Sequence, residues 1–177
     1  MDNFSDKSET SSTSTRVMVM AALWAAIVFC MTMFPKVPIP LGYMNLGTTT
    51  IFLSIFFLRR HEACLAGAVG SCLADLIGGF PIWIIPTAVV KFAVAFAVYT
   101  VMKIVYREGR FWISSALAFI AGSAASVIGY TFFGVFLFGG FEASLQQVPG
   151  LAIEGVMSTV VALVVCGFLK ARLSLKI

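Results

Sequence analysis

Six apolar stretches occupy almost the whole chain between Arg16 and Lys170, and they leave little room for polar helix faces. Of the 177 residues, 60% are hydrophobic and only 11% are charged. Helices of a soluble domain carry a polar face toward water, whereas uniformly apolar helices of about 20 residues are typical of membrane spans. The chain is therefore predicted to be an all-α integral membrane protein.

The apolar stretches predict a compact bundle of six transmembrane helices. The second stretch is short for a full span, and only the polar residues 59–62 separate it from the third, which predicts a tight helical hairpin. The fifth is long enough to be tilted or broken. The predicted spans cover residues 16–34, 46–58, 62–78, 84–106, 111–138 and 149–170.

A polar segment precedes the first span. Residues 1–15 are rich in Ser, Thr, Asp and Lys, and they lack the apolar run of a cleavable signal peptide. This composition predicts a disordered cytoplasmic tail, followed by one membrane domain over residues 16–177.

The basic residues predict how the bundle is oriented. Lys and Arg in short loops stay on the cytoplasmic side of a membrane, and a cytoplasmic N-terminus places every basic cluster on that side. The opposite connections carry only Lys36 and Glu142. Both termini are therefore predicted to be cytoplasmic, and the formal net charge of +4 reflects topology and not nucleic-acid binding. The cytoplasmic basic residues are Lys7, Arg16, Arg59, Arg60, Lys103, Arg107, Arg110, Lys170, Arg172 and Lys176.

Three ionisable residues lie inside predicted spans: Asp75, Lys91 and Glu154. A charge within lipid is costly and marks a candidate functional site. Lys91 and Glu154 each lie five residues past a proline at the outer end of their span, which corresponds to about 7.5 Å along a helix. Asp75 lies about one turn before an external loop. All three are expected in the outer third of the membrane.

Two interpretations of these charges follow. They could line a water-accessible pocket that is open to the outside, where a polar solute exchanges hydrogen bonds with them. Alternatively, Asp75 and Lys91 could merely neutralise each other between neighbouring helices while Glu154 reaches the membrane surface.

The external connections are unlike simple linkers. Residues 34–47 include three prolines, so this loop is expected to be stiff and able to fold over a site. The connection over residues 78–86 contains Trp83, which could stack on a planar ring or anchor the chain at the membrane interface. Gln146 and Gln147 in the last external connection are polar enough to contact a solute, but they are expected to be solvated.

Small residues repeat every four positions on the first span, as the pairs Ala21–Ala25 and Ala22–Ala26. Such pairs let membrane helices approach closely, either within the bundle or against a partner. Catalytic patterns are lacking: the single histidine, His61, adjoins two arginines in a cytoplasmic turn, and no phosphate-binding loop occurs. No enzyme activity, metal or cofactor is expected.

Taken together, residues 16–170 resemble the S components of energy-coupling factor (ECF) vitamin transporters. The shared features are six short helices, a cytoplasmic N-terminus, the alanine pairs, the stretch Pro38–Gly47 and the run Gly67–Gly79 followed by Trp83 and Lys91. The likeness is to the branch of riboflavin, pyridoxine and hydroxymethylpyrimidine transporters. One departure is that Thr48, and not an acidic residue, follows the Asn-Leu-Gly sequence, so no role for an acid is transferred to that position.

The resemblance implies that a vitamin binds near the outer surface of the cell membrane. A membrane coupling subunit, driven by two cytoplasmic ATPases, would dock on the alanine face of the first helix, and the S component would topple to carry its solute inward. Hydroxymethylpyrimidine and the B6 vitamers are the favoured ligands, ahead of riboflavin. The implied ligand residues are Asn45, Asp75, Trp83, Lys91, Tyr130 and Glu154, and the implied docking residues are Ala21, Ala22, Ala25 and Ala26.

The alternative is a stand-alone secondary transporter of a small polar solute. In that case Asp75 or Glu154 would take up a proton as the solute moves, and no ATPase would be needed.

Overall fold

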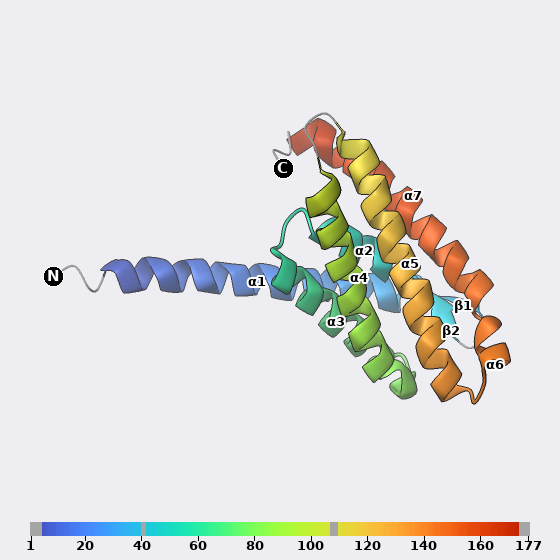
Figure 1. Ribbon diagram of the computed structural model, residues 1–177. Helices are drawn as coiled ribbons and strands as arrows, with labels where there is room; N and C mark the ends of the chain where they lie inside the picture. Colours follow the sequence, from blue (N-terminus) through green and yellow to red (C-terminus); the bar gives the residue numbers. More distant parts are fainter. Residues whose placement is uncertain (1–4, 40–41, 107–109, 174–177) are drawn as a thin grey trace.

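The computed structural model describes residues 5–39, 42–106 and 110–173, and helices make up most of it (Figure 1). The predicted all-α class and the six principal helices are confirmed. These helices are α1 (Ser5–Met33), α2 (Gly47–Ser54), α3 (Arg60–Ile77), α4 (Ile84–Val105), α5 (Phe111–Leu137) and α7 (Val148–Leu173). The smaller elements are β1 (Val37–Ile39), β2 (Gly42–Met44), the 3₁₀ turn η1 (Pro81–Trp83) and α6 (Phe141–Leu145).

Not every principal helix is long enough to cross a membrane. Among the described residues, four segments have the length and apolar character of a span: 15–33, 81–105, 111–137 and 141–170. Helix α3 has 18 residues but includes Arg60, Glu62 and Asp75. Helix α2 has only eight residues, or about 12 Å, so the second predicted span is too short to cross a bilayer of about 30 Å.

The first helix begins earlier than expected. It starts at Ser5, so the chain is helical over much of the segment for which composition predicted an irregular tail. The boundary between tail and membrane domain at residue 15 stays a prediction. Figure 1 shows α1 crossing the other helices steeply, with its N-terminal half projecting beyond them.

The principal helices pack in a series in which α1 contacts α3, α3 contacts α4, α4 contacts α5 and α5 contacts α7. Helix α2 lies at the centre and touches all five of the others. All of its residues except Leu53 are buried, and the Phe52 ring stacks on Phe119 of α5 with 5.0 Å between centroids. A short helix can therefore occupy the core, because its neighbours and not lipid surround its ends.

Helices α1 and α3 approach closely where small residues meet. At Gly70 an added Cβ would lie 2.4 Å from the carbonyl oxygen of Ala25 and 2.9 Å from the Cβ of Val28. Because apolar burial adds little driving force inside lipid, such close backbone contact is a main source of stability between membrane helices.

A β-hairpin that the all-α prediction did not include connects α1 to α2. Strands β1 and β2 are antiparallel, and Val37 pairs with Met44 and Pro38 with Tyr43. Part of the predicted stiff loop, Pro40 and Leu41, lies outside the described residues. The hairpin brings Tyr43 next to Phe80, in the connection between α3 and α4.

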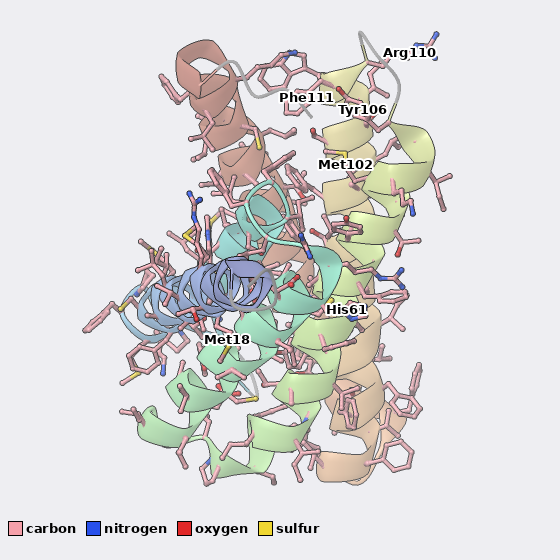
Figure 2. All side chains as sticks on the ribbon, turned by 90° about the vertical axis from the view of Figure 1, so that its left-hand side faces the viewer. Met18, His61, Met102, Tyr106, Arg110 and Phe111 are labelled. Carbon is pink, nitrogen blue, oxygen red and sulfur yellow. The ribbon has the colours of Figure 1, made fainter. Side chains whose placement is uncertain are left out.

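The opposite end of the bundle gathers basic and aromatic residues. Met102 of α4 and Tyr106, which directly follows α4, lie beside Arg110 and Phe111 at the start of α5 (Figure 2). From α7, the Nζ atom of Lys170 lies 4.7 Å from the centroid of the Phe111 ring. The polar cavity described next lies at the other ends of these helices.

Candidate functional site

A lysine, a threonine and a glutamate form a buried polar network between three helices. Lys91 of α4 donates a hydrogen bond of 2.7 Å to the hydroxyl of Thr48 on α2, and Thr48 donates one of 2.9 Å to Glu154 on α7. The ammonium of Lys91 lies 3.8 Å from the same carboxylate oxygen. All three side chains are buried in a region of low dielectric, where an unpaired charge is costly. Lys91 and Glu154 each have the other as the partner of their charge.

The hairpin forms a hydrogen bond with a second buried acid, Asp75. The hydroxyl of Tyr43 donates a hydrogen bond to Asp75 Oδ1. Burial and this hydrogen bond raise the pKa of Tyr43 above its usual value, so its hydroxyl stays protonated as a donor. Lys36 covers the Tyr43 ring at 4.3 Å, and Phe80 contacts the same ring with 4.8 Å between centroids. Strand β2 is thereby fixed against the end of α3.

Aromatic residues form the wall between α4 and α5. Trp83 meets Tyr130 edge to face, with 5.6 Å between centroids, and also packs on Phe138. Tyr130 donates a hydrogen bond to Thr87 and lies 5.4 Å from the Lys91 ammonium. Trp83 is only 7% exposed, so in this structure it packs within the protein and does not anchor a membrane surface.

These groups surround one cavity. Its volume is about 40 Å³, which is room for only a few water molecules. The residues that line it come from α1, β2, α3, α4, α5, α7 and the segments before α2, α4 and α7: Thr32, Tyr43, Asn45, Ser71, Asp75, Trp83, Thr87, Lys91, Tyr130, Gln147, Leu151 and Glu154.

Three polar atoms in the cavity wall have no hydrogen-bond partner among the described residues. They are Thr32 Oγ1, Ser71 Oγ and Asp75 Oδ2. Each belongs to a side chain that is at least 97% buried. Ser71 and Asp75 are four residues apart on α3 and so share one helix face, while Thr32 comes from the adjoining end of α1.

The structure brings all six predicted ligand residues to this cavity. For Asn45 it also shows a structural role, because its side-chain oxygen accepts the backbone N–H of Gly47 at the start of α2. The alternative pairing of Asp75 with Lys91 is wrong: Lys91 pairs with Glu154, and Glu154 is buried and does not reach the surface.

Other lining residues were not singled out from the sequence. The Ser71–Asp75 spacing on one helix face was a usable signal for Ser71, whereas Thr32, Thr87 and Leu151 had none. Gln147, expected to be solvated, is buried and donates hydrogen bonds to the Tyr130 carbonyl and to Ser144. Its position follows from the turn between α6 and α7, which residue type alone does not reveal.

The alanines of α1 divide into two sets. Ala21 and Ala25 are half-buried, and Ala25 faces α3 at Gly70, whereas Ala22 and Ala26 are exposed. The second pair continues an exposed row at spacings of four, from Met18 (labelled in Figure 2) to Cys30. One pair therefore packs within the bundle and the other remains available on its surface.

His61 lies at the start of α3 and is exposed (Figure 2). It is not one of the cavity-lining residues. In the part of the chain that the structure describes, a bundle of apolar helices holds a buried polar cavity beside the hairpin, and such a cavity is typical of membrane proteins that bind a small solute.

Comparison with known proteins places the chain more closely. Residues 12–171 match the family described as the S component of the ECF-type riboflavin transporter, and the chain belongs to this family. It is thus a multi-pass membrane protein and a vitamin transporter's substrate-binding subunit, not an enzyme. The chain is also 32% identical over 133 residues to a Pyrococcus woesei protein described as "uncharacterized protein in gap 3′ region", covering 70% of this chain and 86% of that protein.

Proposed function

We propose that the cavity captures a small planar heterocyclic vitamin at the outer face of the cell membrane. The observation that carries the proposal is the convergence of Asp75, Lys91, Glu154 and Trp83 on one buried space. The faces of a planar ring can contact Trp83 and Tyr130. Polar atoms at the edge of the ring can form hydrogen bonds with Lys91 and Glu154 in place of those that these residues now make.

The charged residues at the two ends of the helices support an outward-facing cavity. Arg60, Lys103 and Lys170 lie at one end of α3, α4 and α7, while Asp75, Lys91 and Glu154 lie toward the other ends of the same helices. Basic residues favour the cytoplasmic side, so the cavity faces outward and both termini are cytoplasmic.

Binding requires the wall of the cavity to move. Pockets for small organic ligands have volumes of roughly 300 Å³ or more, far above the present 40 Å³. Tyr43 of the hairpin lines the cavity and is joined to the rest of the wall by side-chain contacts with Asp75 and with the ring of Phe80. We infer that it swings outward to admit the vitamin and closes over it.

Among vitamins, hydroxymethylpyrimidine and pyridoxine remain the favoured ligands, because a single ring needs the smallest expansion of the cavity. Riboflavin is the alternative that the family description raises. Delivery to the cytoplasm would use a membrane coupling subunit and two ATPases, and the exposed Ala22 and Ala26 offer a flat surface for the coupling subunit.

Titration of the purified chain in detergent tests the proposal. Pyridoxine, hydroxymethylpyrimidine, thiamine and riboflavin are added in turn while tryptophan fluorescence is followed. One vitamin is expected to saturate the signal at one molecule per chain without any ATPase present. Trp83→Phe should remove most of the fluorescence change. Trp112→Phe should leave the change intact, because Trp112 is exposed at the opposite end of the bundle.

Two other results would count against the proposal. The absence of binding by all four vitamins would contradict a vitamin site. Uptake by vesicles that contain this chain alone, driven by a proton gradient, would instead establish the stand-alone secondary transporter.

A further inference from the structure

Two sets of polar side chains lie at the cavity, and they differ in whether their hydrogen-bonding atoms have partners. Lys91, Thr48 and Glu154 bond to one another. On the opposite helices, Thr32 Oγ1, Ser71 Oγ and Asp75 Oδ2 are buried and have no partner in the part of the chain that the structure describes. Buried polar atoms nearly always have partners, so an unmatched group of three that faces a cavity points to a ligand.

The chemistry of the three atoms sets which ligand group fits. Asp75 already accepts the Tyr43 hydroxyl through Oδ1, which leaves Oδ2 as the free oxygen. A carboxylate oxygen accepts hydrogen bonds, while the hydroxyls of Thr32 and Ser71 can accept or donate. The fixed requirement of this group is therefore a hydrogen-bond donor.

The charges around the cavity favour the same conclusion. Lys91 is the one basic residue among the lining residues, and it lies with Glu154. Within the described ranges, the Asp75 carboxylate accepts a hydrogen bond only from the neutral Tyr43 hydroxyl, and Lys36 covers the Tyr43 ring without lining the cavity. A ligand with an N–H group or a positive charge would give the Asp75 carboxylate the hydrogen-bond donor or counter-charge that it lacks among the described residues.

We propose that Thr32, Ser71 and Asp75 form a subsite that selects a heterocycle by its N–H donors. The group recognised is an amino group beside a ring nitrogen, or a protonated ring nitrogen. This inference rests on the proposed function, since it assumes that the cavity takes a vitamin. The Lys91 end then meets an acceptor on the far side of the ring, so the two ends of the cavity fix its orientation.

The unchanged protein supplies the first test. Its Kd is measured for hydroxymethylpyrimidine and for the analogue in which hydrogen replaces the amino group. The analogue is expected to bind at least about tenfold more weakly, because it leaves a buried acceptor unmatched. Equal affinities would overturn the subsite, and so would binding of riboflavin without binding of hydroxymethylpyrimidine, although vitamin capture itself would then stand.

Variants of the lining residues show which side chains cause the difference between the two Kd values. Ser71→Ala and Asp75→Asn should each reduce the ratio of the two Kd values severalfold. Ser158→Ala is the matched control, because Ser158 is also buried and unpartnered among the described residues but does not line the cavity. An unaltered ratio in both cavity variants would refute the assignment. Failure of the unchanged chain to bind any vitamin would refute both this subsite and the proposed function.

Discussion

Lys91 and Thr48 are joined by a hydrogen bond of 2.7 Å that links α4 to the central helix α2. The same Thr48 hydroxyl donates a hydrogen bond to Glu154, so a neutral group connects a buried base to a buried acid. The position that follows the Asn-Leu-Gly sequence is thus part of the polar network even though it carries no charge.

Lys91→Met should weaken vitamin binding by at least tenfold, because the ligand loses a charged donor. It should also lower the free energy of unfolding by about 3 kcal/mol, since Glu154 is left buried without its counter-charge. Adding Glu154→Gln should restore most of the stability but not the binding. Titration and thermal unfolding in detergent measure the two effects, and unchanged affinity in Lys91→Met would remove Lys91 from the site.

Thr48→Val should destabilise the protein by about 1–3 kcal/mol, because Lys91 and Glu154 both lose a hydrogen bond while the shape is kept. Thr49→Val is the matched control: Thr49 is also buried, but its hydroxyl has no partner among the described residues. That control should be neutral or slightly stabilising. Equal melting temperatures for the two variants would show that the Thr48 bridge contributes nothing.

Tyr43→Phe should speed release of the vitamin severalfold, because the hairpin loses its hydrogen bond to Asp75. The folded-state pKa of Tyr43 is raised, so its stabilisation is present below about pH 10, the value of an unfolded chain, and is lost only at higher pH. The ratio of release rates between variant and unchanged protein should therefore stay constant from pH 6 to pH 9. Stopped-flow fluorescence measures it, and a ratio that falls to one in this range would contradict the role of the hydroxyl.

Ala22→Leu and Ala26→Leu should leave vitamin binding intact and abolish uptake with the partner subunits, because a bulky side chain prevents close helix docking. Ala25→Leu should behave differently and lower thermal stability, because Ala25 faces α3 at Gly70. Binding and uptake are assayed on the same preparations. Normal uptake by both surface variants would exclude this face as the docking surface.

Gly70→Ala should lower the free energy of unfolding by about 1–3 kcal/mol, because the new Cβ would lie 2.4 Å from the backbone of α1 at Ala25. Gly140→Ala serves as the control, since an added Cβ there has open space within 4 Å. Thermal unfolding compares them. Equal effects would mean that α1 shifts away from α3 without cost.

The sequence predicted the long helices well and the centre of the bundle poorly. Continuous apolar runs defined α4 and α5 to within one residue, because lipid requires such runs. The same rule made α2 too long, since its burial comes from neighbouring helices that a local pattern cannot reveal. The hairpin was missed because its strands have three residues each, and the prolines indicated only a stiff loop.

The site shows the same limit. Charges inside apolar spans indicated Asp75, Lys91 and Glu154 because such residues are rare in lipid. Their pairing depends on how the helices are rotated and on Thr48 between them, so the sequence suggested Asp75 as the partner of Lys91 where the structure has Glu154. Uncharged residues carry a weaker signal: Ser71 could be found only from its four-residue spacing to Asp75, and Thr32 had no signal at all.

Helix α1 contributes Thr32 to the cavity wall and presents Ala26 on the surface of the bundle, six residues or about 9 Å further toward the N-terminus. An α-helix is stiff over this length, so both residues move as parts of one lever. A partner that tilts α1 at Ala26 would also displace Thr32 from the cavity wall. Binding of the solute at the cavity and docking of the proposed coupling subunit at Ala26 would therefore be mechanically coupled through α1.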